Sequence, residues 1–387
     1  MRILFVGGNF DKNDGRPSSV VAKMVSELER TAFGSTIDVV NGGNYDLLPG
    51  VLDKTPDYDI VFWFANVPND LGKVRNVKEI APKVMLVTSK RNDNGKYEFN
   101  ELVQRALGSK SNLLFEFSKV PKTKLFHIRV IDPLGCVWYD GENIGEAVQS
   151  AMDRLVYLKG ITRQSTVSSN VDKGLVLSWY FDSFKTEEKK SDAEVSIPDQ
   201  TPFVELVREY AVKLQEAMPD IKVERFLGNA SLKLPPQIGR CGKGMPSFKQ
   251  DGMVFVSRRN VPKRFIELSD FVPVYMEDGQ LFYCGDSKPS VDTPVQIRLY
   301  DALPEIRYMV HTHSYIKSAP YTGYAIPCGA VEEVDEVLGV VDKSFKSRDL
   351  DRYAINMKGH GSIIMASTVE GLRGYTFIKR PFPEKMR

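Results

Sequence analysis

Short apolar runs recur through the first part of this chain, and they constrain its fold more than any other feature. The runs cover residues 3–6, 37–40, 59–64 and 84–88. Roughly 20 residues separate the second, third and fourth runs, which leaves room for one helix between two parallel strands. After the first run, apolar side chains fall at helical spacing at Val21, Met24, Val25 and Leu28. The pattern predicts a Rossmann-like domain with a parallel sheet.

A chain of 387 residues is too long for one ordinary hydrophobic core, so two domains are expected. A predicted strand at 125–131 and a predicted helix at 144–158 extend the first domain to about residue 165. A charge run at 185–192 and a proline-containing stretch at 197–202 suggest a linker over 166–200, although the apolar run 175–181 inside it reads as a strand. An amphipathic helix at 203–218 opens a second domain over 201–387.

Composition excludes several classes of partner. The chain is 42% hydrophobic and 26% charged with a net charge of +2, so it offers no basic field for nucleic acid. No apolar run approaches the roughly 20 residues that span a bilayer, and the first run is too short for a signal peptide. The four cysteines are widely spaced, at Cys136, Cys241, Cys284 and Cys328. We therefore expect buried thiols rather than disulfides, a reducing cytoplasmic setting and a small-molecule partner.

Three of the four histidines fall at two places near the end of the chain. His311 and His313 lie in a predicted strand, where residues two apart point to the same face. His360 lies between two glycines just before another predicted strand, and glycine allows a close backbone approach. Three neutral histidines with an open fourth position are typical of a catalytic zinc site. His127, in a predicted strand of the first domain, is expected to be structural.

Two motifs near these histidines resemble those of a known family. They are Lys288-Pro-Ser-Val-Asp-Thr-Pro294 and His311-Thr-His-Ser314. Together with the surrounding stretch from Gly228 to about Gly374, they resemble the class II aldolase/adducin family of zinc-dependent sugar-phosphate aldolases and epimerases. The motifs look most like those of the L-ribulose-5-phosphate 4-epimerases, because fuculose-phosphate aldolases carry glutamate where this chain has Asp292. The resemblance covers a little over a third of the chain.

The resemblance implies roles for particular residues. His311, His313 and His360 match the zinc ligands. Asp292 matches an acid–base carboxylate beside the metal, and Asp335 matches the epimerases' second acid, unless it is a surface aspartate of an acidic helix. The residues that match the substrate-phosphate site are Gly228, Asn229, Ser290 and the pair Arg259-Asn260. That pair stands where the family has Ser/Thr-Gly, so Arg259 is either a charged clamp or a surface arginine.

The family also implies an architecture and an assembly. We expect an α/β/α sandwich with a mainly antiparallel sheet, assembled as a homotetramer with its sites at subunit interfaces. The chain departs from the family pattern at Val291, which replaces a serine, and in a shorter segment between His313 and His360. The family's C-terminal helices are curtailed, and the tyrosine that the epimerases contribute from that tail has no counterpart.

The implied reaction is zinc-dependent making or breaking of a carbon–carbon bond through a metal-stabilised enediolate of a ketose phosphate. Rejoining the aldehyde on its other face gives an epimerase, and releasing it gives an aldolase, or lyase. Two alternatives stay open. One is a non-catalytic adducin-like scaffold, and the other is a protein that binds a nucleotide or nucleotide-sugar through its first domain. In the second case, Gly7-Gly8 and the segment 15–19 would cradle a phosphate.

Overall fold

The structure is a computed structural model of the chain. It describes residues 1–9, 19–41, 50, 53, 55–66, 77–81, 84–123, 125–164, 188–191, 197–217, 226–234, 253–277, 280–345 and 351–386. The predicted strand at 175–181 and most of the predicted phosphate-cradling segment at 15–19 lie outside the described residues. The chain folds into two compact units, one with Met1–Gln164 and Phe382–Arg387 and one with Phe184–Pro381. The last residues thus group with the first unit, whereas the sequence analysis assigned all of 201–387 to the second domain.

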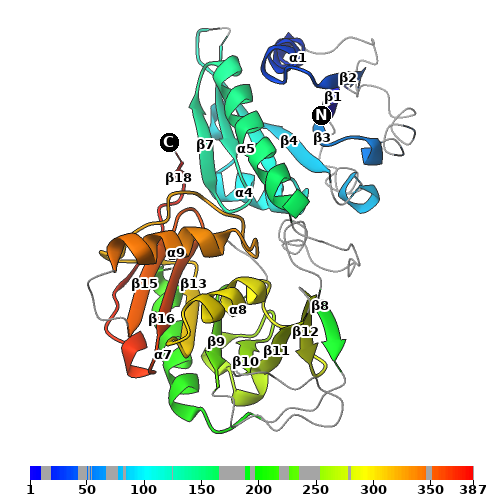
Figure 1. The fold of residues 1–387 in the computed structure, drawn as a ribbon. Coiled ribbons are helices and arrows are strands. Elements are labelled where there is room, and N and C mark those ends of the chain that lie inside the picture. Colours follow the sequence, from blue (N-terminus) through cyan, green and yellow to red (C-terminus); the bar gives the residue numbers. More distant parts are fainter. Residues whose placement is uncertain are drawn as a thin grey trace. The chain divides into compact units, whose positions relative to one another are not determined.

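The first unit is built on an eight-stranded sheet. Its strands are β1 (Arg2–Asn9), β2 (Thr36–Asn41), β3 (Ile60–Asn66), β4 (Met85–Arg91), β5 (Leu113–Lys119), β6 (Phe126–Ile131), β7 (Cys136–Gly141) and β18 (Glu384–Lys385). Their order is β18-β7-β6-β5-β4-β3-β1-β2 (Figure 1). The strands β1 to β5 pair in parallel, while β6 and β7 continue the sheet antiparallel. The predicted parallel sheet is confirmed, with an antiparallel extension.

Helices cover the first sheet because its strands are apolar on both sides. The long helices are α1 (Ser19–Thr31), α4 (Phe99–Gly108) and α5 (Ile144–Gln164), and α1 packs against α5. Leu4 belongs to a cluster on one side of the sheet, while the ring of its neighbour Phe5 stacks on Phe62 with centroids 5.4 Å apart. Side chains of a strand alternate between faces, so burial of both neighbours requires a layer on each side.

The second unit is built on another eight-stranded sheet. Its strands are β8 (Glu188–Ser191), β9 (Asn229–Lys233), β10 (Val254–Ser257), β11 (Phe271–Glu277), β12 (Gln280–Cys284), β13 (Tyr308–Thr312), β15 (Arg352–Met357) and β16 (Gly361–Ala366). Their order is β15-β16-β13-β9-β10-β11-β12-β8, and every pair except β12–β8 is antiparallel. The strands β14 (Tyr315–Ile316) and β17 (Phe377–Ile378) form a separate small ribbon.

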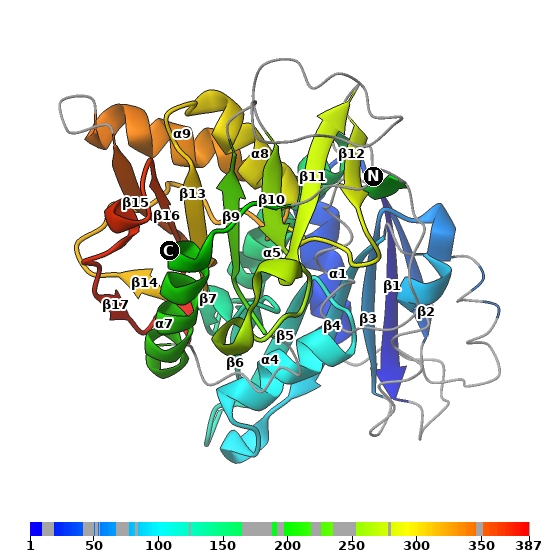
Figure 2. The same ribbon diagram turned by 90° about the horizontal axis from the view of Figure 1, so that it is seen from below.

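Three helices complete a sandwich around this sheet. They are α7 (Thr201–Ala217), α8 (Thr293–Ala302) and α9 (Glu333–Ser344). In β10, Val254 and Val256 join the cluster that contains the apolar faces of α8 and α9, while Phe255 joins the cluster that contains α7. Figure 2 shows α7 on the opposite side of the sheet from α8 and α9. The expected α/β/α sandwich with a mainly antiparallel sheet is confirmed.

Short 3-10 helices connect some of these elements, at η2 (Thr55–Asp57), η3 (Asp93–Gly95), η4 (Lys263–Phe265), η5 (Leu268–Asp270) and η6 (Glu370–Leu372). None of the helices in the described ranges is long and apolar enough to cross a membrane.

Candidate metal centre

The three C-terminal histidines meet at one end of the second sheet. His311 lies in β13, His313 follows its end, and His360 lies in the turn between β15 and β16. Their ring centroids are 4.6 to 5.1 Å apart, and the exposed fractions of the side chains are 8% or less. One nitrogen of each ring lies within 4.8 Å of the others, so a single ion could contact all three.

Strand register and one glycine produce this convergence. β13 pairs antiparallel with β16, so Thr312 faces Ser362 and the turn that carries His360 lies beside His313. A β-carbon on Gly361 would collide with the carbonyl oxygen of Thr312. Only glycine therefore allows this approach, as the sequence pattern suggested.

Hydrogen bonds fix which ring nitrogens are available for a metal. His311 Nδ1 lies 3.0 Å from the carbonyl oxygen of Ser362, which can only accept, so Nδ1 carries the proton. His360 Nδ1 lies 3.0 Å from Glu333 Oε1. The Nε2 atoms of His311 and His360 are buried and have no hydrogen-bond partner among the described residues. Buried polar nitrogens without partners are costly, and an ion between them would satisfy both.

Burial also sets the protonation of the rings. It lowers the pKa of His311 to about 4, and it lowers the pKa of His313 well below the ordinary value. Burial acts in the same direction on His360, but the carboxylate of Glu333 outweighs it and raises the pKa of that ring. Neutral imidazoles are the form that binds zinc. His311 and His313 are in that form, and a proton on His360 would be released on binding, so the residues present fit a divalent metal ion.

Asp292 lies next to the histidines at the N-cap of α8. Its Oδ2 is 3.8 Å from His311 Nε2 and accepts a hydrogen bond of 2.7 Å from Asn229 Nδ2, while Oδ1 accepts one of 2.9 Å from Cys328 Sγ. Burial alone would raise the pKa of Asp292, but His311, His360 and the hydrogen bonds from the Cys328 thiol and the Gly329 backbone hold it below the ordinary value. The side chain is therefore an ionised carboxylate, ready to take a proton.

The residues predicted to hold a phosphate come together beside this carboxylate. Gly228 lies against the backbone of His311 at the entry to β9. The segments around residues 226, 260 and 290 are tied by backbone and side-chain hydrogen bonds. Asn260 has a left-handed φ of 60°, a conformation that asparagine tolerates, where the family has glycine. The half-buried Ser290 precedes α8, and its carbonyl oxygen accepts a hydrogen bond from the Thr293 hydroxyl.

Of the predicted side chains, Arg259 is paired with an acid and Asp335 is exposed. Arg259 Nη2 forms an ion pair of 2.8 Å with Glu188 of β8, so its charge is already matched. Asp335 lies on the exposed side of the first turn of α9, outside the histidine cluster of its own chain. The buried acid of that turn is Glu333 instead.

Sequence reasoning missed Glu333 and Cys328, although the helix pattern contains a signal. Glu333, Val337 and Val340 recur at helical spacing and are all buried, whereas Asp335 falls on the other face of α9. A carboxylate in the apolar stripe of a helix calls for a specific partner. That partner is His360.

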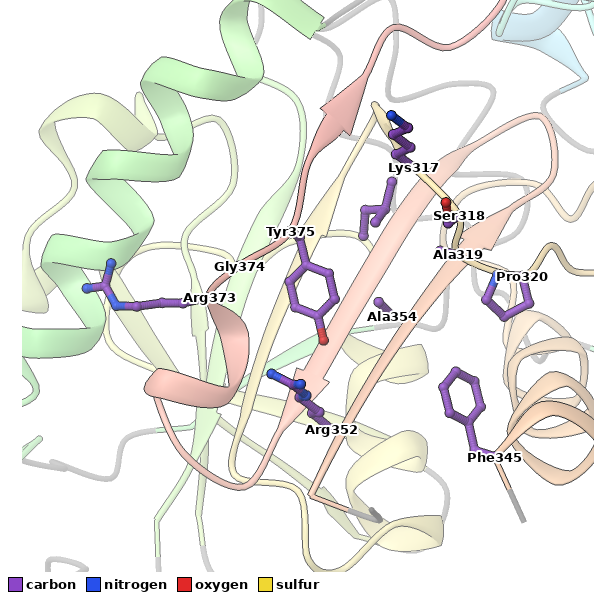
Figure 3. Close-up of a pocket in the computed structure, with 11 residues that line it drawn as sticks. Lys317, Ser318, Ala319, Pro320, Phe345, Arg352, Ala354, Arg373, Gly374 and Tyr375 are labelled. Atoms are coloured by element: carbon purple, nitrogen blue, oxygen red, sulfur yellow. The ribbon is translucent and has the colours of Figure 1, made fainter. Parts of the chain in front are cut away.

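A pocket of about 460 Å³ in the second unit is separate from the metal centre (Figure 3). Lys317, Arg352, Arg373 and Tyr375 contribute polar groups to its lining. Arg352 begins β15 while His360 follows the other end of that strand, and none of the predicted site residues lines the pocket.

The fold and the histidine cluster define an α/β/α domain with a group of side chains that could hold a metal ion, and comparison with known proteins points to a family for this part of the chain. Residues 222–374 match the family model described as the Class II Aldolase and Adducin N-terminal domain. The match contains the three histidines, Asp292, Cys328 and Glu333. It supports the class II aldolase/adducin family for this part of the chain, in which most of the second unit lies.

Among solved structures, the DNA/pantothenate metabolism flavoprotein from Streptococcus pneumoniae is similar to part of this chain. The identity is 10% and the TM-score is 0.31, over 41% of this chain and 99% of the flavoprotein. A likeness at this level carries no argument about function.

Proposed function

We propose that the second unit is a zinc-dependent centre of the aldolase or epimerase type, which makes or breaks a carbon–carbon bond of a sugar phosphate. One observation carries the proposal. The buried Nε2 atoms of His311 and His360 have no hydrogen-bond partner among the described residues, and they lie in a cluster that also contains an ionised carboxylate, Asp292. A class II aldolase/adducin domain over 222–374 supports the same reaction class.

Each residue of the cluster has a distinct part in this chemistry. His311, His313 and His360 would hold the ion, which supplies a Lewis acid for the negative charge that develops on the substrate oxygens. Asp292 would move the proton, since it is ionised and its carboxylate is fixed on both oxygens. Burial of the cluster keeps bulk water from the reacting atoms.

A cation near Asp292 supports an anionic substrate. Lys263 Nζ donates a hydrogen bond of 3.1 Å to the carbonyl oxygen of Phe226, and no carboxylate pairs with it among the described ion pairs. Burial lowers the pKa of Lys263 to about 8, while Asp292 raises it, so the two groups are close enough to interact. We propose that Lys263 serves the phosphate together with Ser290, Asn260 and the Gly228-Asn229 turn, in place of Arg259, which pairs with Glu188.

Assays on a panel of ketose phosphates test this proposal, with L-ribulose 5-phosphate as the first substrate. Wild type should contain zinc and should cleave or epimerise at least one member of the panel. His313→Ala should lose the metal and the activity together. Activity that survives complete loss of metal would contradict the mechanism. Formation of an epimer without free aldehyde would support the 4-epimerase-like outcome, and aldehyde release would support an aldolase.

The adducin-like scaffold remains the main alternative for the second unit. It predicts a folded protein without zinc affinity, so a chelator-competition titration of the full chain separates it from the enzyme. Strong zinc binding would exclude a scaffold that has lost the metal.

A second candidate function belongs to the first unit. Its parallel strands run in the order β2-β1-β3-β4-β5, so the direction of winding changes between β1 and β3. Open α/β sheets bind ligands at the carboxyl ends of strands at such a point, often a nucleotide. Calorimetric titration of the full chain with nucleotides and nucleotide-sugars tests it, and no heat with any of them would argue against it.

We also propose the homotetramer that the family resemblance implies. Light scattering of the full chain measures the assembly directly, and a monomer at micromolar concentration would contradict it.

A further inference from the structure

Cys328 and Glu333 contact the predicted site residues, although the resemblance assigns neither of them a role. Cys328 lies in the segment between β14 and α9, and Glu333 is the first residue of α9. Both side chains are buried, with exposed fractions of 5% and 3%. Buried groups of this kind need a specific partner, and each has one in the metal centre.

Glu333 holds His360 in one orientation. Its Oε1 lies 3.0 Å from His360 Nδ1, and both side chains are almost completely buried. With Nδ1 engaged, the lone pair of Nε2 is left for the side where His311 and His313 lie. A carboxylate on the far nitrogen of a metal-binding histidine fixes its tautomer and raises its basicity.

Cys328 acts in the same way on the carboxylate. Its thiol donates to Asp292 Oδ1 at 2.9 Å, and Asn229 donates to Oδ2 at 2.7 Å. Both oxygens are therefore fixed, with Oδ2 turned toward His311 Nε2. Asn229 is itself fixed, since Gln296 Nε2 donates to its Oδ1.

This turn packs against Val291, where the family has a serine. A β-carbon on Gly329 would lie 2.6 Å from Val291 Cγ1, so the turn packs directly onto the valine. Gly329 has a left-handed φ of 81°, and its neighbour Cys328 thereby reaches Asp292. Val291, the residue that departs from the family motif, therefore packs against the turn that carries Cys328 and leads into Glu333.

We propose that Cys328 and Glu333 are positioning residues of the metal centre: Glu333 aims His360 Nε2 at the ion, and Cys328 sets the rotamer of Asp292 without binding the ion itself. The inference rests on the proposed metal site. It makes the metal affinity depend on Glu333 of α9. The sequence had pointed to a different acid of that helix, the exposed Asp335.

Zinc affinity, measured on the full chain by competition with a chromogenic chelator, tests the role of Glu333. Glu333→Ala should weaken zinc binding about 10- to 100-fold. Glu333→Gln should lose less, because its amide oxygen still accepts from Nδ1. Asp335→Asn is the matched control on the same helical turn, and it should bind zinc like wild type.

The outcomes separate the inference from the proposed function. If wild type binds no zinc, the proposed function fails. If wild type binds zinc and both Glu333 variants match it, the positioning role is wrong while the metal site stands. If Glu333→Ala does not fold, the comparison of Glu333→Gln with Asp335→Asn decides.

The visible spectrum of the cobalt-substituted protein tests the role of Cys328. Because the thiol donates to Asp292, we expect no intense thiolate-to-cobalt charge-transfer band in wild type. Cys328→Ser, which keeps a donor, should reproduce the wild-type d–d bands, whereas Cys328→Ala should shift them by freeing the carboxylate. An intense charge-transfer band in wild type that disappears in Cys328→Ser would show that Cys328 is a ligand and would overturn this role, as would identical d–d bands in wild type and Cys328→Ala.

Discussion

Acid should destabilise the metal-free protein through His311, and the structure gives the size of the effect. The folded protein holds the pKa of His311 at about 4 because the ring is buried, while the unfolded chain has the ordinary value of 6.5. A base whose pKa is lowered by folding stabilises the folded state above its unfolded pKa, and this contribution is lost as the pH falls. From these two pKa values, proton linkage predicts that the free energy of unfolding falls by about 2 kcal/mol between pH 7.5 and pH 5.

The other two histidines act in known directions. The lowered pKa of His313 adds to the loss, while the raised pKa of His360 opposes it, since Glu333 favours the charged ring. Comparison of wild type with His311→Gln isolates the contribution of the His311 ring, because glutamine cannot bind a proton at that position. We therefore expect the free energy of unfolding of wild type to fall about 2 kcal/mol more steeply than that of His311→Gln over this pH range.

Urea unfolding followed by circular dichroism measures this difference on chelator-treated protein at several pH values. Saturating zinc should suppress it, because a metal-bound ring cannot be protonated. Parallel pH profiles for wild type and His311→Gln would refute the argument from burial. A wild-type protein that gains stability toward pH 5 while His311→Gln does not would contradict its sign.

Three further variants test other parts of the site. Gly361→Ala should prevent folding of the β15–β16 turn or abolish zinc binding, because its β-carbon would collide with the Thr312 carbonyl oxygen; a variant with normal melting temperature and zinc content would contradict this close approach. Asp292→Asn should keep the zinc but lower kcat about 10²- to 10⁴-fold if Asp292 moves the proton; unchanged turnover would remove that role. Lys263→Met should raise KM for a ketose phosphate and leave KM for the unphosphorylated ketose unchanged, whereas equal changes for both would show that Lys263 does not serve the phosphate.

Local sequence patterns predicted most of the fold because the responsible interactions are local. Apolar runs at βαβ spacing gave the parallel strands β1 to β4, and period-3.6 patterns gave α1 and α7. The antiparallel extension through β6 and β7 was not evident, since a strand's direction depends on its partner rather than on its own residues. The return of the last strand, β18, to the first sheet has the same origin, because it is a pairing between distant parts of the chain.

For the metal centre, the candidate metal ligands could be predicted from sequence motifs, whereas their hydrogen-bond partners became evident only in the structure. His311, His313 and His360 could be grouped from scarcity and spacing, and the structure brings their rings together. Glu333 could not be singled out among the neighbouring acids. Which of them is buried depends on which face of α9 packs inward, and that face carries Glu333 and not Asp335.

The interpretation of Arg259 could not anticipate its ion pair. Glu188 lies on β8, a strand that joins the sheet at β12 through pairing between segments far apart in the sequence. A guanidinium near a predicted phosphate site therefore looked like a clamp until its partner was known.

Anomalous diffraction at the zinc edge, from crystals of the zinc-loaded protein, shows directly whether His311, His313 and His360 hold a zinc ion. We predict one peak per chain, about 2.0–2.1 Å from the Nε2 atoms of His311 and His360 and from one ring nitrogen of His313. We also predict that His360 Nδ1 stays hydrogen-bonded to the Glu333 carboxylate. No peak among the three rings, or a zinc ion bound elsewhere in the chain, would contradict the account.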